Sequence, residues 1–158
     1  MIFLKFNKGY SLLLLILLFA ACKQHGPSKY EHIQTILVDS LHLQNAYKAI
    51  LILEDGSCPS CQKELNRFIL HHIDKDDVLF VVSNDERFVD LSELKTIEKQ
   101  NLVIDNQKLF YNKNIIEDSA VIILKDKQID TILVLSNSDV LQRNLNYLSS
   151  LVFSDENE

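Results

Sequence analysis

Two cysteines three positions apart, Cys58 and Cys61, are the residues whose types and spacing point most clearly to chemistry. Such a pair can exchange a disulfide with another protein, one cysteine attacking and the other resolving the mixed disulfide. Only the thiolate attacks, so the site needs surroundings that favour a negatively charged sulfur. The start of an α-helix supplies them, because its unpaired N–H groups and its dipole both favour negative charge.

The elements on either side of the pair predict this setting. The apolar run 49–53 is too short for a buried helix and indicates a buried strand. Apolar residues at helical spacing then predict an amphipathic helix from about Pro59 to His72. Proline suits the first turn, where its missing N–H is not needed. We therefore expect Cys58 at the helix N-terminus and Cys61 one turn further in, where burial keeps a thiol protonated.

The stretch Cys58-Pro59-Ser60-Cys61-Gln62-Lys63-Glu64 fits a C-x-x-C-x-x-E pattern. It resembles the thioredoxin-like superfamily, and within it the TlpA/ResA-like membrane-anchored thiol–disulfide oxidoreductases. The resemblance implies an α/β, thioredoxin-like fold, with a central mixed β-sheet and helices on both faces. It also implies that Cys58 attacks, that Cys61 resolves, and that Glu64 modulates their proton transfers. A structural alternative for Glu64 is open, because acids in the first turn of a helix stabilise its dipole.

The chain departs from that family at the position that should face the disulfide. The family places a cis-proline just before a late strand, whereas Ser119 stands there in this chain, before residues 121–124. The chain's two prolines are Pro27 and Pro59. Because a non-proline cis bond costs about 3 kcal/mol, we expect a trans bond at Ser119 and an altered surface for substrate docking.

Acidic residues near the motif have two interpretations. Thioredoxin itself carries a buried acid on the strand before its motif, whereas residues 50–53 here are wholly apolar. Glu54 and Asp55 follow that strand, and we interpret them as solvated loop residues. If they lie near Cys58, their charges would disfavour the thiolate. At the far end of the helix, His71 and His72 stand where positive charge suits the dipole.

Residues 1–21 read as an export signal, with Lys5 and Lys8 before an apolar stretch too short to span a bilayer. The signal ends in Phe19-Ala20-Ala21-Cys22, which resembles the bacterial lipobox, whose cysteine carries lipid and becomes the mature N-terminus. The resemblance implies a bacterial cell-envelope protein that is lipid-anchored and faces the periplasm or the exterior. Ordinary secretion with cleavage nearby, and an uncleaved anchor, are the alternatives.

With Cys22 assigned to lipid, Cys58 and Cys61 are the remaining thiols, in a compartment that permits disulfides. We expect a lipidated linker over residues 22–30, one thioredoxin-like domain over 31–153 and a disordered acidic tail over 154–158. The net charge is −6, and the acid-free leader holds two of the lysines. This balance argues against nucleic acid or anionic lipid as a partner.

The rest of the chain predicts further elements. We expect a helix over residues 29–44, with a strand over 35–39 as its rival, and a second buried strand over 78–82, parallel to 49–53. Asp90 and Glu93 form a capping-box-like start for a helix to about Lys99. Later elements are a short strand at 102–104, a loop with a helical turn over 105–118, a hairpin of 121–124 with 129–135, and a last helix capped by Ser136 or Asn137.

The sequence favours a membrane-tethered thiol–disulfide oxidoreductase whose partners are protein thiols or disulfides and an electron donor. No organic cofactor and no metal is implied. For the cysteine pair alone, a structural disulfide and half of a metal site are alternatives. For the whole protein, the alternative is a non-catalytic thioredoxin-fold lipoprotein that binds a partner and keeps a structural disulfide. A thiol peroxidase ranks below both, because no threonine or arginine lies between Ser57 and Lys63.

Overall fold

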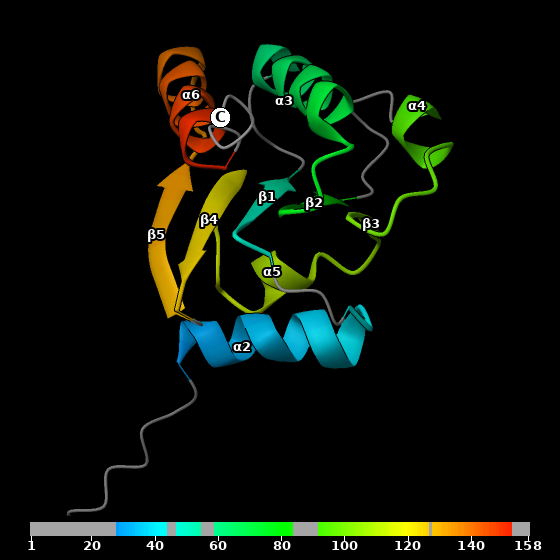
Figure 1. Ribbon diagram of the computed structural model, residues 1–158, viewed down its shortest axis with the longest axis vertical. Helices are drawn as coiled ribbons and strands as arrows, with labels where there is room; N and C mark the ends of the chain where they lie inside the picture. Colours follow the sequence, from blue (N-terminus) through cyan, green and yellow to red (C-terminus); the bar gives the residue numbers. More distant parts are fainter. Residues whose placement is uncertain (1–27, 44–46, 55–58, 84–91, 127, 153–158) are drawn as a thin grey trace, which may run out of the picture.

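The computed structural model describes residues 28–43, 47–54, 59–83, 92–126 and 128–152. These residues form a five-stranded sheet with helices on both faces (Figure 1). The strands are β1 Ala49–Leu53, β2 Val78–Ser83, β3 Leu102–Asp105, β4 Ala120–Lys125 and β5 Gln128–Val134. The helical elements are α2 Lys29–Thr35, the π-helical turn η1 Ile36–Ser40, α3 Pro59–His72, α4 Ser92–Lys95, α5 Leu109–Asn112 and α6 Ser138–Val152.

The sheet is mixed, with strand order β3-β2-β1-β4-β5. Strands β1, β2 and β3 run parallel to one another, whereas β4 is antiparallel to β1 and β5 to β4. The expected α/β class, central mixed sheet and thioredoxin-like order of elements are confirmed. The parallel pairing of β1 with β2, which brackets α3, is confirmed as well.

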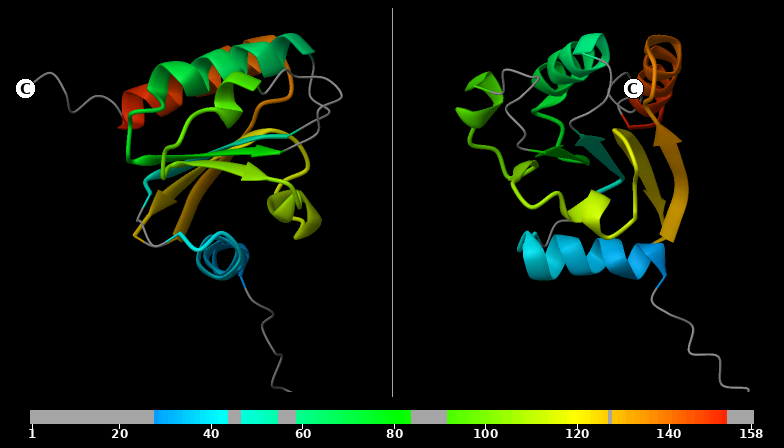
Figure 2. Two further views of the ribbon diagram at one scale, coloured as in Figure 1. Left: turned by 90° about the vertical axis from the view of Figure 1, so that its right-hand side faces the viewer. Right: turned by 180° about the vertical axis from the view of Figure 1, so that it is seen from behind.

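Three layers are visible when the sheet is seen from its side (Figure 2). Helices α3 and α6 lie on one face of the sheet, and α2 and α5 lie on the other. All five residues of β1 are buried, because this central strand contacts both layers. Its side chains alternate: Ala49, Leu51 and Leu53 join the core under α3 and α6. Ile50 and Ile52 join the core over α2 and α5.

Helix α2 and η1 confirm the expected helix and show that the rival strand is wrong. The Ser28 side chain and Glu31 form a capping box that starts α2. The helix continues through η1, where Leu41 N–H donates to the Ile36 carbonyl at 2.9 Å. The described helical residues end at Ser40, short of the expected residue 44, and the chain turns at His42 with φ 56°.

Helix α4 is shorter than the sequence predicted, ending at Lys95 rather than about Lys99. The Thr96 hydroxyl donates to the Glu93 carbonyl at 2.7 Å, and such a side-chain bond competes with helix continuation. The Ile97 N–H donates to the Leu94 carbonyl three residues back, which tightens the end of the helix. Asp90, the expected cap, lies outside the described residues.

The later elements agree with the sequence. Strand β3, the helical turn α5 and the β4–β5 hairpin are confirmed. Asn137 is the cap of α6, since its side-chain oxygen accepts from the Val140 N–H at 3.1 Å. The apolar stripe of α6 is buried in the core under that helix, and comprises Leu141, Leu145, Leu148 and Val152.

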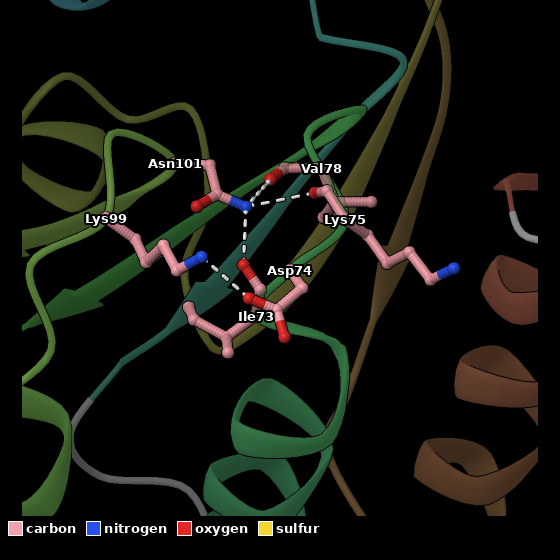
Figure 3. A network of polar contacts seen from close by, with 6 residues as sticks. All are labelled: Ile73, Asp74, Lys75, Val78, Lys99 and Asn101. Atoms are coloured by element: carbon pink, nitrogen blue, oxygen red, sulfur yellow. Dashed lines mark hydrogen bonds and ion pairs between the residues drawn. The ribbon is translucent and has the colours of Figure 1, made fainter.

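Asn101 joins the turn after α3 to the start of β3 (Figure 3). Its side-chain nitrogen lies 3.1 Å from the Ile73 carbonyl oxygen, 2.9 Å from that of Lys75 and 3.2 Å from that of Val78. The residue is 3% exposed, so water cannot easily replace these bonds. Beside it, the hydrogen bond from Lys99, and then the charge of Lys99, hold the pKa of Asp74 below its ordinary value. That pair is exposed and contributes little to stability.

Replacing Asn101 with alanine should lower the free energy of unfolding by about 2 kcal/mol, because buried carbonyls lose their donor. Urea unfolding measures the loss. Asn112→Ala is the matched control, since Asn112 is exposed and its amide donates once, to the Gln107 carbonyl at 2.7 Å. We expect the control to change the free energy by less than about 0.5 kcal/mol. Equal losses of unfolding free energy in the two variants would show that the buried hydrogen bonds of Asn101 stabilise the fold no more than the exposed bond of Asn112.

Candidate functional site

Cys61 is the third residue of α3 and is buried, with 1% of its surface exposed. The expected burial of this cysteine is confirmed. Its sulfur is disulfide-bonded. The chain's other cysteines, Cys22 and Cys58, lie outside the described residues, and so does the sulfur that Cys61 is bonded to. The placement of Cys58 at the helix N-terminus remains a prediction.

Glu54, the residue directly after β1, is not the solvated loop residue that the sequence suggested. It is 3% exposed. Its backbone N–H donates to the Ser119 hydroxyl at 2.9 Å, and its carbonyl accepts from the same hydroxyl at 3.2 Å. The sequence interpretation failed because this contact joins residues 65 positions apart. Asp55 lies outside the described residues.

Ser119 precedes β4 and is completely buried. Every peptide bond within the described part of the chain is trans, including the bond between Asp118 and Ser119. The expected trans geometry at this position is therefore confirmed. Because β4 runs antiparallel to β1, its start lies beside the end of β1, with Ala120 opposite Ile52. Ser119 thus lies at the end of the sheet where β1 leads toward the cysteine motif.

Buried polar residues gather at this end of the molecule. Six polar or charged residues are buried among those that the structure describes, and five of them lie here. They are Glu54, Ser83 and Asp105 at the carboxyl ends of the three parallel strands, Ser119 before β4, and Gln62 in the first turn of α3. Burying polar groups is costly, so their concentration at one end marks a specialised region. Functional sites of parallel sheets also lie outside the carboxyl ends of the strands.

Asp105 has a structural explanation. One of its carboxylate oxygens accepts from the Gln107 N–H at 2.9 Å, and the other accepts from the Leu109 N–H at 2.7 Å. These charge-assisted bonds hold the turn that leads into α5. We therefore assign Asp105 to the architecture of this end rather than to its chemistry.

Glu64 lies on α3, three residues after Cys61, which makes the two residues neighbours on the helix surface. Its side chain is 42% exposed and pairs with Arg67, with 3.3 Å between oxygen and nitrogen. Glu64 is the sixth residue of the helix, and α3 has no acid in its first turn. The structural alternative for Glu64 assumed that it lies in the first turn and stabilises the helix dipole, so the structure does not support that alternative.

His72, at the opposite end of α3, does not behave as the helix dipole suggests. Partial burial first, and then the charges of His71 and Lys75, hold its pKa below the ordinary value of 6.5. Its ring also lies 4.4 Å from that of Phe68, centre to centre. Eleven residues of helix separate His72 from Cys61, or about 16 Å. His72 therefore belongs to the packing of the helix end, and neither histidine belongs to the cysteine site.

An open hollow of about 530 Å³ adjoins the segment that carries Ser119. Its lining includes Asp118 and Ala120, the two neighbours of Ser119. Further apolar lining comes from Ile115, Ile116, Ile132 and Val134, and charged lining from Lys29 and Glu117. The hollow thus combines an apolar surface with charged residues of both signs.

The described residues offer neither a metal-binding cluster nor a membrane-spanning helix. They contain no group of three or more histidine, cysteine, aspartate or glutamate side chains placed to hold a metal ion. They also contain no helix that is both long and apolar enough to cross a bilayer.

Comparisons with known proteins returned little. No protein-family model matches the chain, and no curated protein matches it. A solved structure, a thioredoxin-like protein from Bacteroides caccae ATCC 43185, is similar over 66% of this chain, with 16% identity and a TM-score of 0.36. The matched region spans 41% of that structure's chain. At so low a score, the fold assignment rests on the strand order and pairing observed in this protein.

Proposed function

We propose that this protein is a membrane-tethered thiol–disulfide oxidoreductase that acts outside the cytoplasm through Cys58 and Cys61. The observation that carries the proposal is the state of Cys61, which is buried and disulfide-bonded in the first turn of α3. The C-x-x-C spacing makes Cys58 the partner that needs least rearrangement of the chain. The gathering of buried polar residues at the same end of the sheet supports a functional site there.

The exchange has two steps. The Cys58 thiolate attacks a substrate disulfide, which forms a mixed disulfide and releases one substrate thiolate. The Cys61 thiol then loses its proton, and its sulfur attacks the Cys58 sulfur, which releases the second substrate thiol. Two electrons pass from the protein dithiol to the substrate, and the Cys58–Cys61 disulfide is formed. A separate electron donor must reduce this disulfide before the next cycle, and the reverse sequence would oxidise a substrate dithiol.

Two carboxyl groups are candidates for moving the proton of Cys61. Glu64 is its neighbour on α3 and is open to water, so it can pass a proton to solvent. Glu54 is buried at the end of β1 and is thereby separated from bulk water. We assign the proton transfer to Glu64, because the helix places it close to Cys61 in sequence and in space.

A non-catalytic binding module with a structural disulfide is the second candidate. Ser119 in place of proline favours it, because the expected docking surface for substrate backbone is changed. The hollow beside Ser119 also offers a place for a partner's side chain. Thiol reactivity separates the two candidates, since a structural disulfide needs neither an activated cysteine nor a resolving one.

Alkylation of the reduced protein near pH 7 should modify Cys58 well before Cys61, because Cys61 is buried. In cells, Cys61→Ser should accumulate mixed disulfides with other proteins, since the resolving sulfur is gone, whereas Cys58→Ser should accumulate almost none. Mass spectrometry of alkylated peptides and non-reducing gels measure the two effects. Slow, similar alkylation of both cysteines, with no trapped species from either variant, would establish the binding module with a structural disulfide instead.

Glu64→Gln should slow release of the mixed disulfide by about tenfold. That is less than the roughly 10²-fold effect of a typical acid–base group, because water can partly replace an exposed carboxylate. Stopped-flow exchange with a model disulfide should show that the first attack keeps its rate. Glu98→Gln is the matched control, being an exposed glutamate outside α3 that does not line the hollow beside Ser119. Equal rates for Glu64→Gln and wild type would assign the proton transfer to another group.

Cys22→Ser should move the protein from the membrane fraction to the soluble exported fraction. The reason is the lipobox-like Phe19-Ala20-Ala21-Cys22, whose cysteine would carry the lipid anchor. Cell fractionation with mass measurement of the N-terminal peptide tests the change. A Cys22→Ser protein that stays membrane-bound and keeps its leader would contradict the lipid anchor and leave an uncleaved apolar anchor as the explanation.

A further inference from the structure

We propose that Ser119 is a positioning residue whose buried hydroxyl holds the end of β1 and thereby favours closure of the Cys58–Cys61 disulfide. This inference rests on the proposed function. The Ser119 hydroxyl accepts from the Glu54 N–H at 2.9 Å and donates to the Glu54 carbonyl at 3.2 Å. The Ser119 side chain therefore satisfies both the N–H and the carbonyl group of Glu54, the residue directly after β1.

The two bonds between Ser119 and Glu54 lie just beyond the point where the pairing of β1 with β4 ends. The backbone pairing of β1 with β4 ends at Ile52 and Ala120. Glu54 lies two residues beyond that pair, where no further residue of β4 is available to hold it. Here the Ser119 hydroxyl makes the hydrogen bonds to the Glu54 backbone that a paired strand would otherwise make. It restrains β1 up to the last residue before the segment that carries Cys58.

Ser119 is itself firmly held, so it can act as an anchor. Its N–H donates to the Asp118 side chain at 2.7 Å, and its carbonyl accepts from the Leu135 N–H at 2.8 Å, just past the end of β5. The residue is completely buried, so solvent cannot substitute for its hydroxyl without rearrangement. The two bonds to Glu54 thus tie the end of β1 to the β4–β5 hairpin.

The consequence for the cysteines follows from chain entropy. Residues 55–58 run between Glu54, held by Ser119, and Pro59, where α3 begins. A disulfide closes more readily when the chain ends that carry its two sulfurs are already restrained. Cys61 is disulfide-bonded in the structure that contains the Ser119 bonds, so these bonds are present in the oxidised form. Without this restraint, closing the disulfide would cost more chain entropy, so removing the bonds should favour the reduced dithiol.

The decisive measurement is the equilibrium of the full-length protein with a glutathione redox buffer. Ser119→Ala should shift this equilibrium toward the dithiol by about tenfold, which corresponds to a reduction potential about 30 mV less negative. Ser119→Thr, which keeps the hydroxyl, should stay within about twofold of wild type. Ser83→Ala is the matched control, because Ser83 is also buried at this end of the sheet, and its hydroxyl has no hydrogen-bond partner among the residues that the structure describes.

Chemical denaturation of both redox forms separates positioning from general support of the fold. If Ser119 is a positioning residue, Ser119→Ala should lower the folding equilibrium constant of the oxidised form about tenfold more than that of the reduced form. Equal destabilisation of both forms, with an unmoved potential, would overturn the proposal. If Ser119→Ala does not fold, Ser119→Thr and Ser119→Val provide a pair of matched shape, and a shift confined to the valine variant supports the proposal.

The outcome is distinguishable from failure of the proposed function. Suppose that Cys61→Ser traps no partner, yet Ser119→Ala still shifts the reduction potential. The role of Ser119 is then supported, but for a structural disulfide, and the oxidoreductase function is refuted. If partners are trapped, yet the potential of Ser119→Ala equals that of wild type, the oxidoreductase stands and the positioning is refuted.

Discussion

The burial of β1 on both faces is the constraint on which the rest of the structure depends. All five of its residues are buried, and they pair with β2 on one side and β4 on the other. Each large aliphatic side chain buried in this way contributes about 1.5–3 kcal/mol. Because side chains alternate between the faces of a strand, one run of apolar residues supplies both helical layers with their central contacts.

This constraint also decides where polar chemistry can lie. A strand that must be apolar throughout leaves polar groups only at its ends. In this protein they gather at the carboxyl end of the parallel strands, as Glu54, Ser83 and Asp105. Each such group needs a hydrogen bond to offset the loss of water. The Ser119 hydroxyl meets that need for the backbone groups of Glu54, and the turn after Asp105 meets it for the Asp105 carboxylate.

The contact between Glu54 and Ser119 ties the residue after β1 to the residue before β4. A proline at position 119 could not provide a side-chain hydroxyl, whereas the serine satisfies both backbone groups of Glu54. The neighbouring hollow adjoins the same segment, since Asp118 and Ala120 are part of its lining.

Local patterns in the sequence were enough to predict most elements. Apolar runs located β1 and β2, and helical spacing located α3 and α6, because these patterns reflect which face of each element is buried. Burial of Cys61 followed from its place in the first turn of α3, where one helix face meets the core. Helix ends were harder. Helix α4 ended at Lys95, where Thr96 and Ile97 both bond back to carbonyls of the helix, and α2 with η1 stopped short of residue 44.

Only the tertiary structure decided the strand order, which places β3 at one edge, and the environment of Glu54. An acid after a strand has the same local pattern whether water or protein surrounds it. It is buried here beside a serine 65 residues away, which the antiparallel pairing of β1 with β4 brings next to it. The sequence by itself thus determined which segments are strands and helices and where the cysteines stand in the chain. The packing of those segments determined which polar groups lie at that end of the sheet, because their contacts join residues that no local pattern connects.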